Sequence, residues 1–295
     1  MAPDSATPNR QVLVRPALYV VATPIGNLAD VTERARQVLA QVDLIAAEDT
    51  RHSARLLQHL GVTTRMIAYH DFSTGQQEQA LLTRLQQGNA IALISDAGTP
   101  LISDPGYGLV RQCRQSGVPV IPVPGASALV SALSVAGLPS DRFIFEGFLP
   151  AKAGARQSCL KALADEVRTL VFYESPHRIL ASIDDMAAVF GGQREAVICR
   201  ELTKTWETVY GDSLAGIQQW LRNDDNQQRG EFVVLVHGAP KTAGQDIDPA
   251  DEHVLQLLLR ELPMKQACSL AADITGRKKN QLYKRALELA VVQDS

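Results

Sequence analysis

The segment 91–94 is entirely apolar, and a loop rich in Gly, Pro, Ser and Asp follows it as far as residue 106. An apolar segment without alternation is typical of a strand buried on both faces, as in a parallel sheet that helices cover. A long loop at the carboxyl end of such a strand lies where open α/β sheets bind ligands. An ordinary connection to a helix, with Asp104 as N-cap and Pro105 at the first helical position, explains only the end of the loop. We therefore predict that residues 96–100 bind a ligand, because this part exceeds the usual length of a connection.

The chain repeats this alternation of strands and helices in two sections that differ in sheet type. In the first section, helices separate strands that we expect at residues 18–22, 44–47, 66–69, 91–94 and 118–123, which predicts a mostly parallel sheet. In the second section, the expected strands are 143–148, 170–173, 196–199, 208–210 and 232–236. The strands within 196–210 read as a hairpin, so this sheet is predicted to be mixed. The predicted fold class is α/β, with two αβα domains.

A third section is helical. Residues 238–249 have the Gly- and Pro-rich composition of a linker, and three short helices are expected after it, in the manner of a small helix-turn-helix module. The predicted domains are a disordered N-terminal tail (1–16), an N-terminal α/β domain (17–125), a C-terminal α/β domain (126–238), a linker (239–249) and a helical module (250–295).

Composition excludes several classes of protein but leaves the ligand open. The net charge of −3 neither requires nor excludes a nucleic-acid partner. The four cysteines show no paired spacing, so disulfides and metal sites are not favoured and a reducing cytoplasm is the expected setting. No apolar run reaches membrane-spanning length, and the polar N-terminal residues lack the apolar region of a signal peptide. The P-loop, the G-x-G-x-x-G turn and the nucleophile elbow are also missing from the sequence.

What remains is a set of strand-end loops rich in Gly, Pro and acidic residues. They are residues 23–27, 48–52, 96–100, 124–127, 174–178, 201–207 and 229–231. Phosphate groups would need more donors than these loops offer, whereas carboxylates and carbonyls suit a cationic centre such as a sulfonium. Glycine and proline allow the backbone to approach a ligand closely.

Seven motifs, in order along the chain, resemble one known family. They are LYVVATPIGNL (18–28), AEDTR (47–51), SDAGTP (95–100), SDPG (103–106), PGAS (124–127), YESPHR (173–178) and RELTK (200–204). The chain resembles the ribosomal RNA small subunit methyltransferase I family, of the tetrapyrrole-methylase-like superfamily, over about residues 18–236 and in its helical tail. Tetrapyrrole methylases carry Gly-Asp-Pro where this chain has Gly98-Thr99-Pro100, which argues against a porphyrin-type substrate.

The resemblance implies that S-adenosyl-L-methionine (SAM) binds in a cleft between the two α/β domains. It also implies 2′-O-methylation of a cytidine ribose in the decoding region of 16S ribosomal RNA, within the small ribosomal subunit, by a homodimer. The expected cofactor-binding residues are Pro24, Gly26, Asp96, Gly98, Thr99, Pro100, Ala126, Ser127, Tyr173, Glu174, Ser175, Leu202 and Gly230. Two alternatives stay open: a SAM-dependent methylase of a small tetrapyrrole-like substrate, and a helix-turn-helix nucleic-acid binder whose α/β body senses a metabolite.

The candidate general bases for such a reaction are Glu201, Lys204 and His177. An ordinary lysine is protonated at neutral pH, so we favour Lys204 as a holder of a phosphate or hydroxyl group and Glu201 as its partner. A purely structural Glu–Lys pair is the alternative.

The candidate RNA-binding residues are Arg51, Arg55, Arg178, Arg277, Lys278 and Lys279, which could contact phosphates. Tyr173 is either a neighbour of the adenine or a buried core tyrosine.

Overall fold

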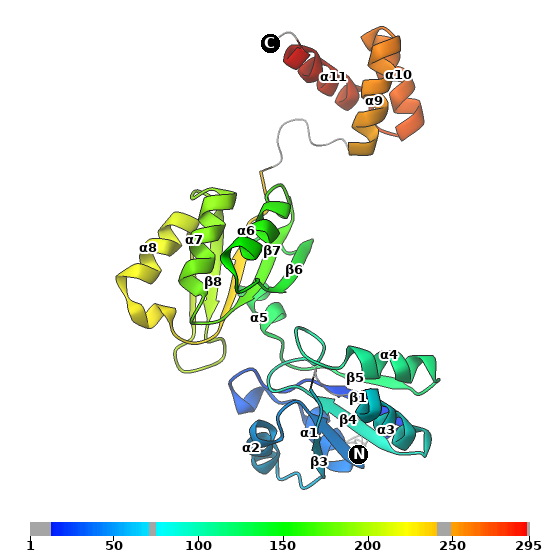
Figure 1. The fold of residues 1–295 in the computed structure, drawn as a ribbon, viewed down its shortest axis with the longest axis vertical. Coiled ribbons are helices and arrows are strands. Elements are labelled where there is room, and N and C mark those ends of the chain that lie inside the picture. Colours follow the sequence, from blue (N-terminus) through cyan, green and yellow to red (C-terminus); the bar gives the residue numbers. More distant parts are fainter. Residues whose placement is uncertain (1–12, 71–74, 241–248, 294–295) are drawn as a thin grey trace, which may run out of the picture. The chain divides into compact units, whose positions relative to one another are not determined.

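The computed structural model describes residues 13–70, 75–240 and 249–293, and the chain divides after His237 into two compact units. The first unit holds two five-stranded sheets, and the second holds three helices (Figure 1). No helix within these described ranges is long and apolar enough to cross a membrane.

The first sheet, which was predicted to be mostly parallel, is fully parallel, with the strand order β3-β2-β4-β1-β5. Its strands are β1 (Ala17–Val21), β2 (Leu44–Ala47), β3 (Met66–Ala68), β4 (Ala90–Ile94) and β5 (Val120–Val123). The helices of this half are α1 (Glu33–Gln41), α2 (Thr50–Leu60), α3 (Gly75–Gln86) and α4 (Tyr107–Gln115), with a short 3-10 turn η1 (Leu28–Asp30) after β1.

Helices cover both faces of this sheet. Tyr19 of β1 packs in one core cluster with Leu39 of α1, while its neighbour Leu18 packs in a second cluster with Leu81 of α3 and Leu109 of α4. Successive side chains of a strand point to opposite faces, so a strand covered on both sides must be apolar at every position. This is why all five residues of β4 are buried and why the sequence shows no alternation there.

The second sheet is mixed, with the order β6-β7-β10-β8-β9, in which only β6 and β7 run parallel. Its strands are β6 (Phe143–Phe148), β7 (Thr169–Glu174), β8 (Glu195–Arg200), β9 (Thr208–Ser213) and β10 (Phe232–Val236). The helices of this half are α5 (Ala128–Val135), α6 (Ala153–Ala162), α7 (Ile179–Phe190) and α8 (Leu214–Asn223), with a 3-10 turn η2 (Asp225–Gln228) before β10. The predicted hairpin is confirmed as the antiparallel pair β8–β9.

The faces of this second sheet are covered by different parts of the unit. Helices α6, α7 and α8 pack on one face. On the other face, Leu129 and Ala132 of α5 pack against Val171 and Val197, and Ile25 reaches the same cluster from the loop after β1. The two sheets are therefore joined by a shared apolar layer, in which a loop of the first half supplies a core residue to the second.

The second unit consists of α9 (Pro249–Glu261), α10 (Met264–Thr275) and α11 (Lys279–Gln293), which confirms the three predicted helices. Leu255, Cys268 and Leu282, one from each helix, are fully buried in its core. Gly276 ends α10 in the left-handed conformation, with φ of 70°, which glycine adopts without steric cost.

The structure differs from the sequence predictions at the start of α4. Asp104 is not the N-cap, because α4 begins at Tyr107 and its N-cap is Gly106, with φ of 134° and no side-chain cap. A Cβ on Gly106 would lie 2.8 Å from Cδ2 of Leu93, so close packing of this turn on β4 requires glycine. Asp104 instead lies on the lining of a cavity that is described below.

The predicted N-terminal tail also differs at its end. The Tyr19 hydroxyl accepts a hydrogen bond from the Val14 amide at 2.8 Å, and Arg15 forms an ion pair with Asp43. Residues 13–16 are thus attached to the first sheet rather than loose. Residues 1–12 of the predicted tail and residues 241–248 of the predicted linker lie outside the described residues.

Candidate active site

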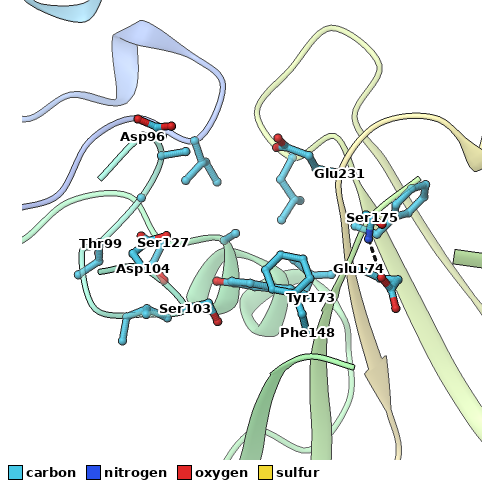
Figure 2. A pocket seen from close by; sticks show the side chains of 18 of the residues that line it. Asp96, Thr99, Ser103, Asp104, Ser127, Phe148, Tyr173, Glu174, Ser175 and Glu231 are labelled. Atoms are coloured by element: carbon cyan, nitrogen blue, oxygen red, sulfur yellow. Dashed lines mark hydrogen bonds between the residues drawn. The ribbon is translucent and has the colours of Figure 1, made fainter. Parts of the chain in front are cut away.

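A cavity of about 430 Å³ lies where loops of the two halves of the first unit meet (Figure 2). This volume is within the range of small-molecule binding sites. Its lining residues come from the carboxyl ends of β1, β2, β4, β6, β7 and β8 and the loops that follow them, from the start of α5 and from the start of β10. They are Ile25, Glu48, Asp96, Ala97, Gly98, Thr99, Ile102, Ser103, Asp104, Ser127, Ala128, Phe148, Tyr173, Glu174, Ser175, Pro176, Cys199, Leu202, Glu231, Phe232 and Val233.

The chemistry of this lining favours a ligand with a positive charge. Five carboxylic acids border the cavity, whereas its described lining contains no Lys, Arg or His. The negative charge of a phosphate-rich ligand would meet no cation in this lining, whereas the carboxylates would attract the positive charge of a sulfonium. The residues present therefore fit the sulfonium of SAM. Metal binding has no comparable support, because the described residues contain no group of three or more His, Cys, Asp or Glu placed to hold an ion.

The wall contributed by the first half is the loop after β4. Thr23 and Gly98 exchange two backbone hydrogen bonds of 2.8 Å and 3.1 Å, which fix this loop to the end of β1. Thr99 donates its hydroxyl to the carbonyl of Ala126 at 3.0 Å. The Asp96 carboxylate accepts the amide of Asp49 at 3.0 Å, so this side chain is oriented at the rim of the cavity.

Backbone strain is concentrated in the two loops that flank the cavity. The four non-glycine residues with positive φ in the described ranges are Leu101 (73°), Ser103 (64°), Glu201 (52°) and Thr203 (65°). Such conformations are disfavoured for residues with a Cβ and are held in place by the surrounding structure. The chain therefore keeps both loops in one defined shape.

Tyr173 joins the second sheet to the start of α5. Its hydroxyl accepts a hydrogen bond from the Leu129 amide at 3.0 Å, and its ring makes edge contacts with Phe145 and Phe148. Burial is the main cause that raises the pKa of this hydroxyl. Tyr173 thus satisfies an amide of the first turn of α5, and its ring also forms part of the cavity lining.

The Glu174 carboxylate is engaged in bonds within the second half. It is buried and accepts the Ser182 hydroxyl at 2.6 Å, the Ser175 amide at 2.8 Å and the Arg178 guanidinium at 2.9 Å (Figure 2 draws the Ser175 bond). Arg178 also donates to the Leu149 carbonyl at 3.1 Å. Arg178, one of the predicted RNA-binding residues, is therefore engaged in an ion pair and a hydrogen bond within the protein.

A compact ion-pair cluster adjoins the cavity through Glu231. Nζ of Lys204 lies 2.8 Å from Oε1 of Glu201 and 2.9 Å from Oε2 of Glu231, and Glu201 also accepts the Glu231 amide at 3.0 Å. For Glu201, burial opposes ionisation, but the hydrogen bonds from Lys204 and from the Glu231 amide outweigh it and lower the pKa. For Lys204, burial acts against the charge, but bonds to the two carboxylates outweigh it and raise the pKa. At neutral pH this lysine is a cation.

Two of the predicted cofactor-binding glycines lie against this cluster. A Cβ on Gly26 would be 2.5 Å from Cγ of Lys204, and a Cβ on Gly230 would be 2.5 Å from Cγ of Glu201. Gly230 also has φ of 97°, which disfavours any other residue. Both glycines therefore give room to the side chains of the cluster.

The structure brings most of the predicted cofactor-binding residues together around one cavity. Those that line it are Asp96, Gly98, Thr99, Ser127, Tyr173, Glu174, Ser175 and Leu202, and those that do not are Pro24, Gly26, Pro100, Ala126 and Gly230.

Of the candidate bases, His177 is exposed and is not part of the lining. Arg51 and Arg55 are exposed on α2, and Lys278 and Lys279 are exposed at the start of α11. Arg277 is paired with Asp251 at 2.7 Å.

Sequence reasoning missed several lining residues. Glu48 and Glu231 stand in loops that the sequence singled out, but neither was chosen as a site residue. Phe148 ends a predicted strand, and an aromatic residue at the carboxyl end of a strand was a signal that could have been used. Cys199 could not be found in this way, because it lies within a buried strand; burial raises the pKa of its thiol to about 12, which excludes a thiolate nucleophile at neutral pH.

Comparison with known proteins assigns the chain to a family. Residues 17–218 match the family described as "Tetrapyrrole (Corrin/Porphyrin) Methylases", and residues 245–290 match the "RsmI C-terminal HTH domain". The protein named "Ribosomal RNA small subunit methyltransferase I" of Escherichia coli O157:H7 is 56% identical over 272 residues, which cover 92% of this chain and 94% of that protein. The protein of the same name from Pseudomonas aeruginosa is 57% identical over 272 residues, with 92% and 96% covered.

Solved structures support the same fold at low sequence identity. The uroporphyrin-III C-methyltransferase of Thermus thermophilus complexed with S-adenyl homocysteine is 17% identical and covers 74% of this chain and 96% of its own, with a TM-score of 0.53. Diphthine synthase is 14% identical and covers 75% of this chain and 90% of its own, with a TM-score of 0.56. The matched family and the curated relatives, together with these structures, confirm the predicted α/β class and the predicted use of SAM. The chain belongs to the family of ribosomal RNA small subunit methyltransferase I, the SAM-dependent methyltransferases that the seven sequence motifs resemble.

Proposed function

We propose that this protein transfers the methyl group of SAM to the 2′-hydroxyl of a cytidine ribose in the decoding region of 16S ribosomal RNA. The observation that carries the proposal is identity of more than half the residues with relatives named for that ribosomal subunit, over 92% of the chain. The acidic lining of the cavity supports the same proposal from the chemistry of the site.

The cavity residues would hold SAM. Thr99, Ser127 and Tyr173 offer polar groups and a ring along the lining, and Asp96 supplies a carboxylate for a cationic or hydroxyl-bearing ligand. The bound SAM supplies an electrophilic methyl group on a sulfonium. The role of the protein is then to place a ribose hydroxyl in line with that methyl group and to receive its proton.

The ion-pair cluster is the part of the chain suited to that role. Lys204 keeps its proton because two carboxylates contact it, so it acts as a donor that holds the ribose hydroxyl or a neighbouring phosphate. Glu201 fixes the lysine. Glu231 both lines the cavity and contacts Lys204, and we assign it as the acceptor of the 2′-hydroxyl proton as the O–CH₃ bond forms and the S–CH₃ bond breaks. His177 lies outside the lining and is given no part in this step.

The RNA would be held by exposed cations, in a homodimer acting in the cytoplasm. Arg51 and Arg55 are exposed on one face of α2, and Lys278 and Lys279 are exposed on the C-terminal unit. Such residues bind phosphates without reading sequence. The match of residues 245–290 to a helix-turn-helix domain of this family supports a role for that unit in substrate binding.

The alternative is a SAM-dependent methylase of a small tetrapyrrole-like substrate, which the description of the matching family favours. The deciding experiment incubates the protein with methyl-labelled SAM and either small ribosomal subunits that lack the modification or a tetrapyrrole. We expect label in 16S RNA, at a 2′-O-methylcytidine after nuclease digestion. Label in the tetrapyrrole alone would overturn the proposal, and label on a base would overturn its 2′-O assignment.

A further inference from the structure

Trp206 is the most exposed large apolar side chain in the described part of the molecule, with 72% of its surface accessible. Its ring makes no stacking or edge contact with another ring among the described residues. The only other tryptophan, Trp220, instead stacks on Tyr210 at 4.6 Å. A tryptophan side chain with this degree of exposure presents apolar surface to water and contributes little to the core.

The backbone that carries this ring is held in place by a buried arginine. Arg200 is only 8% exposed, and it donates to the carbonyls of Trp206 at 3.2 Å, Arg229 at 2.7 Å and Asn226 at 3.0 Å. A buried guanidinium bonded to three loop carbonyls fixes the loops on both sides of it. The backbone at Trp206 is therefore held in place by the protein's own hydrogen bonds.

The same loop carries the ion-pair cluster. Lys204 precedes Trp206 by two residues, and its amide donates to the Glu201 carbonyl at 3.0 Å. The Glu207 carboxylate accepts the Thr203 amide at 2.5 Å, and the Glu207 amide donates to the Lys204 carbonyl at 3.2 Å. An exposed aromatic ring and a cation thus stand two residues apart on one hydrogen-bonded loop, and the cation contacts Glu231 of the cavity lining.

We infer that Trp206 is a stacking platform for an unpaired base of the RNA substrate, at or beside the nucleotide that is methylated. This inference rests on the proposed function. Proteins recognise unpaired RNA by stacking splayed bases on aromatic rings, next to cations that contact the phosphates. An indole on such a loop suits this role, because the loop backbone does not have to be ordered when a base stacks on the ring. A second copy of the chain is the other possible occupant, and the test below separates the two.

The first measurement compares Trp206→Leu and Trp206→Phe in methyl transfer to small ribosomal subunits. Loss of a base stack costs about tenfold in binding, so we expect Trp206→Leu to raise KM for the subunits by about that factor with SAM affinity unchanged. Trp206→Phe keeps an aromatic face and should recover most of the loss. Phe143→Leu is the matched control, because Phe143 is 40% exposed but lies at the start of β6, away from the strand ends that form the site.

The second measurement reports on stacking itself. In Trp220→Phe, Trp206 is the one remaining tryptophan, so its fluorescence can be followed alone. A short single-stranded RNA containing cytidines should quench this fluorescence, and an RNA of the same length with abasic riboses should not. Equal quenching by both would overturn the inference, because it would indicate contact with the backbone only.

The outcomes separate this inference from the proposed function. Normal transfer by the unaltered protein, together with an unchanged KM in Trp206→Leu, would overturn the stacking role alone. A change of oligomeric state in Trp206→Leu, measured by light scattering, would assign the ring to an interface between copies and would also overturn it. Failure of the unaltered protein to methylate 16S RNA would overturn the proposed function itself.

Discussion

Gly26 lies against the side chain of Lys204, so that a loop of the parallel sheet touches the cation held by the mixed sheet. A Cβ on Gly26 would be 2.5 Å from Cγ and 3.0 Å from Cε of Lys204. The lysine stem therefore occupies the space that any other residue at position 26 would need. The two halves of the first unit therefore contact each other at Lys204, the proposed catalytic group, as well as through the apolar layer that they share.

Gly26→Ala should impair methyl transfer without unfolding the protein. The added methyl group displaces the stem of Lys204 and moves Nζ relative to Glu201 and Glu231, and misplacement of about 1 Å can cost roughly a hundredfold in rate. We expect kcat to fall by at least about tenfold with a nearly unchanged melting temperature. Gly154→Ala is the control, because a Cβ there meets nothing within 4 Å. Equal activity of the two variants would contradict the prediction.

Substitutions of Lys204 test whether this residue acts in methyl transfer as a cation or as a proton acceptor. Because its pKa is raised by Glu201 and Glu231, Lys204→Met should lower kcat by about a hundredfold or more, while Lys204→Arg, which keeps the charge, should retain more activity. Near-normal transfer by Lys204→Met would remove this residue from the mechanism. Arg222→Met breaks an exposed ion pair with Asp184 and serves as the control for loss of a positive charge.

Tyr173→Phe tests the bond between the second sheet and α5. The variant leaves the Leu129 amide, now bonded to the tyrosine hydroxyl at 3.0 Å, without its acceptor. An unsatisfied buried donor costs about 1–3 kcal/mol, and this part-buried bond should cost no more than that. Because the start of α5 lines the cavity, we expect lower stability in urea and weaker SAM binding by calorimetry. Tyr210→Phe removes a hydroxyl that donates to the exposed Asp212 and should have little effect on either.

Acid should weaken the fold through Glu166. Its carboxylate accepts two hydrogen bonds of 2.7 Å from the Arg168 side chain, which with the Arg168 amide lower its pKa from 4.5 to about 2. A lowered pKa in the folded state means that the stabilisation is complete above the unfolded value and is lost as the pH falls from about 4.5 towards 2. Glu166→Gln should thus reduce the urea midpoint at pH 7 but approach the unaltered protein near pH 2. An equal deficit at both pH values would show that the loss does not come from ionisation.

The C-terminal unit should contribute affinity for RNA through its exposed lysines. Removing the charges of Lys278 and Lys279 together should weaken binding to small ribosomal subunits and reduce the dependence of log K on log salt by up to about 2, because each phosphate contact contributes slightly less than 1. SAM affinity should stay unchanged. Lys161→Ala, at the end of α6, is the control; an identical effect of that variant would show that net charge alone is responsible.

The sequence predicted most of the fold because its signals are local. Segments such as β4 are apolar throughout, and polar or turn-forming residues follow them, so strands, helices and sheet types could be assigned without tertiary information. It was wrong at Asp104, since the choice of Gly106 as N-cap depends on packing against Leu93, which no local pattern contains.

By itself, the sequence determined the parallel and mixed sheets, the three-helix C-terminal unit and the loops that carry polar groups, because these follow from residue periodicity and turn chemistry. Only the tertiary structure decided which residues meet. It bonded the Tyr173 hydroxyl to the Leu129 amide, placed Glu231 beside Lys204, and set Gly26 against the lysine stem. These contacts join residues far apart in the chain, so they depend on how the two sheets pack and on the space that each side chain leaves for the next.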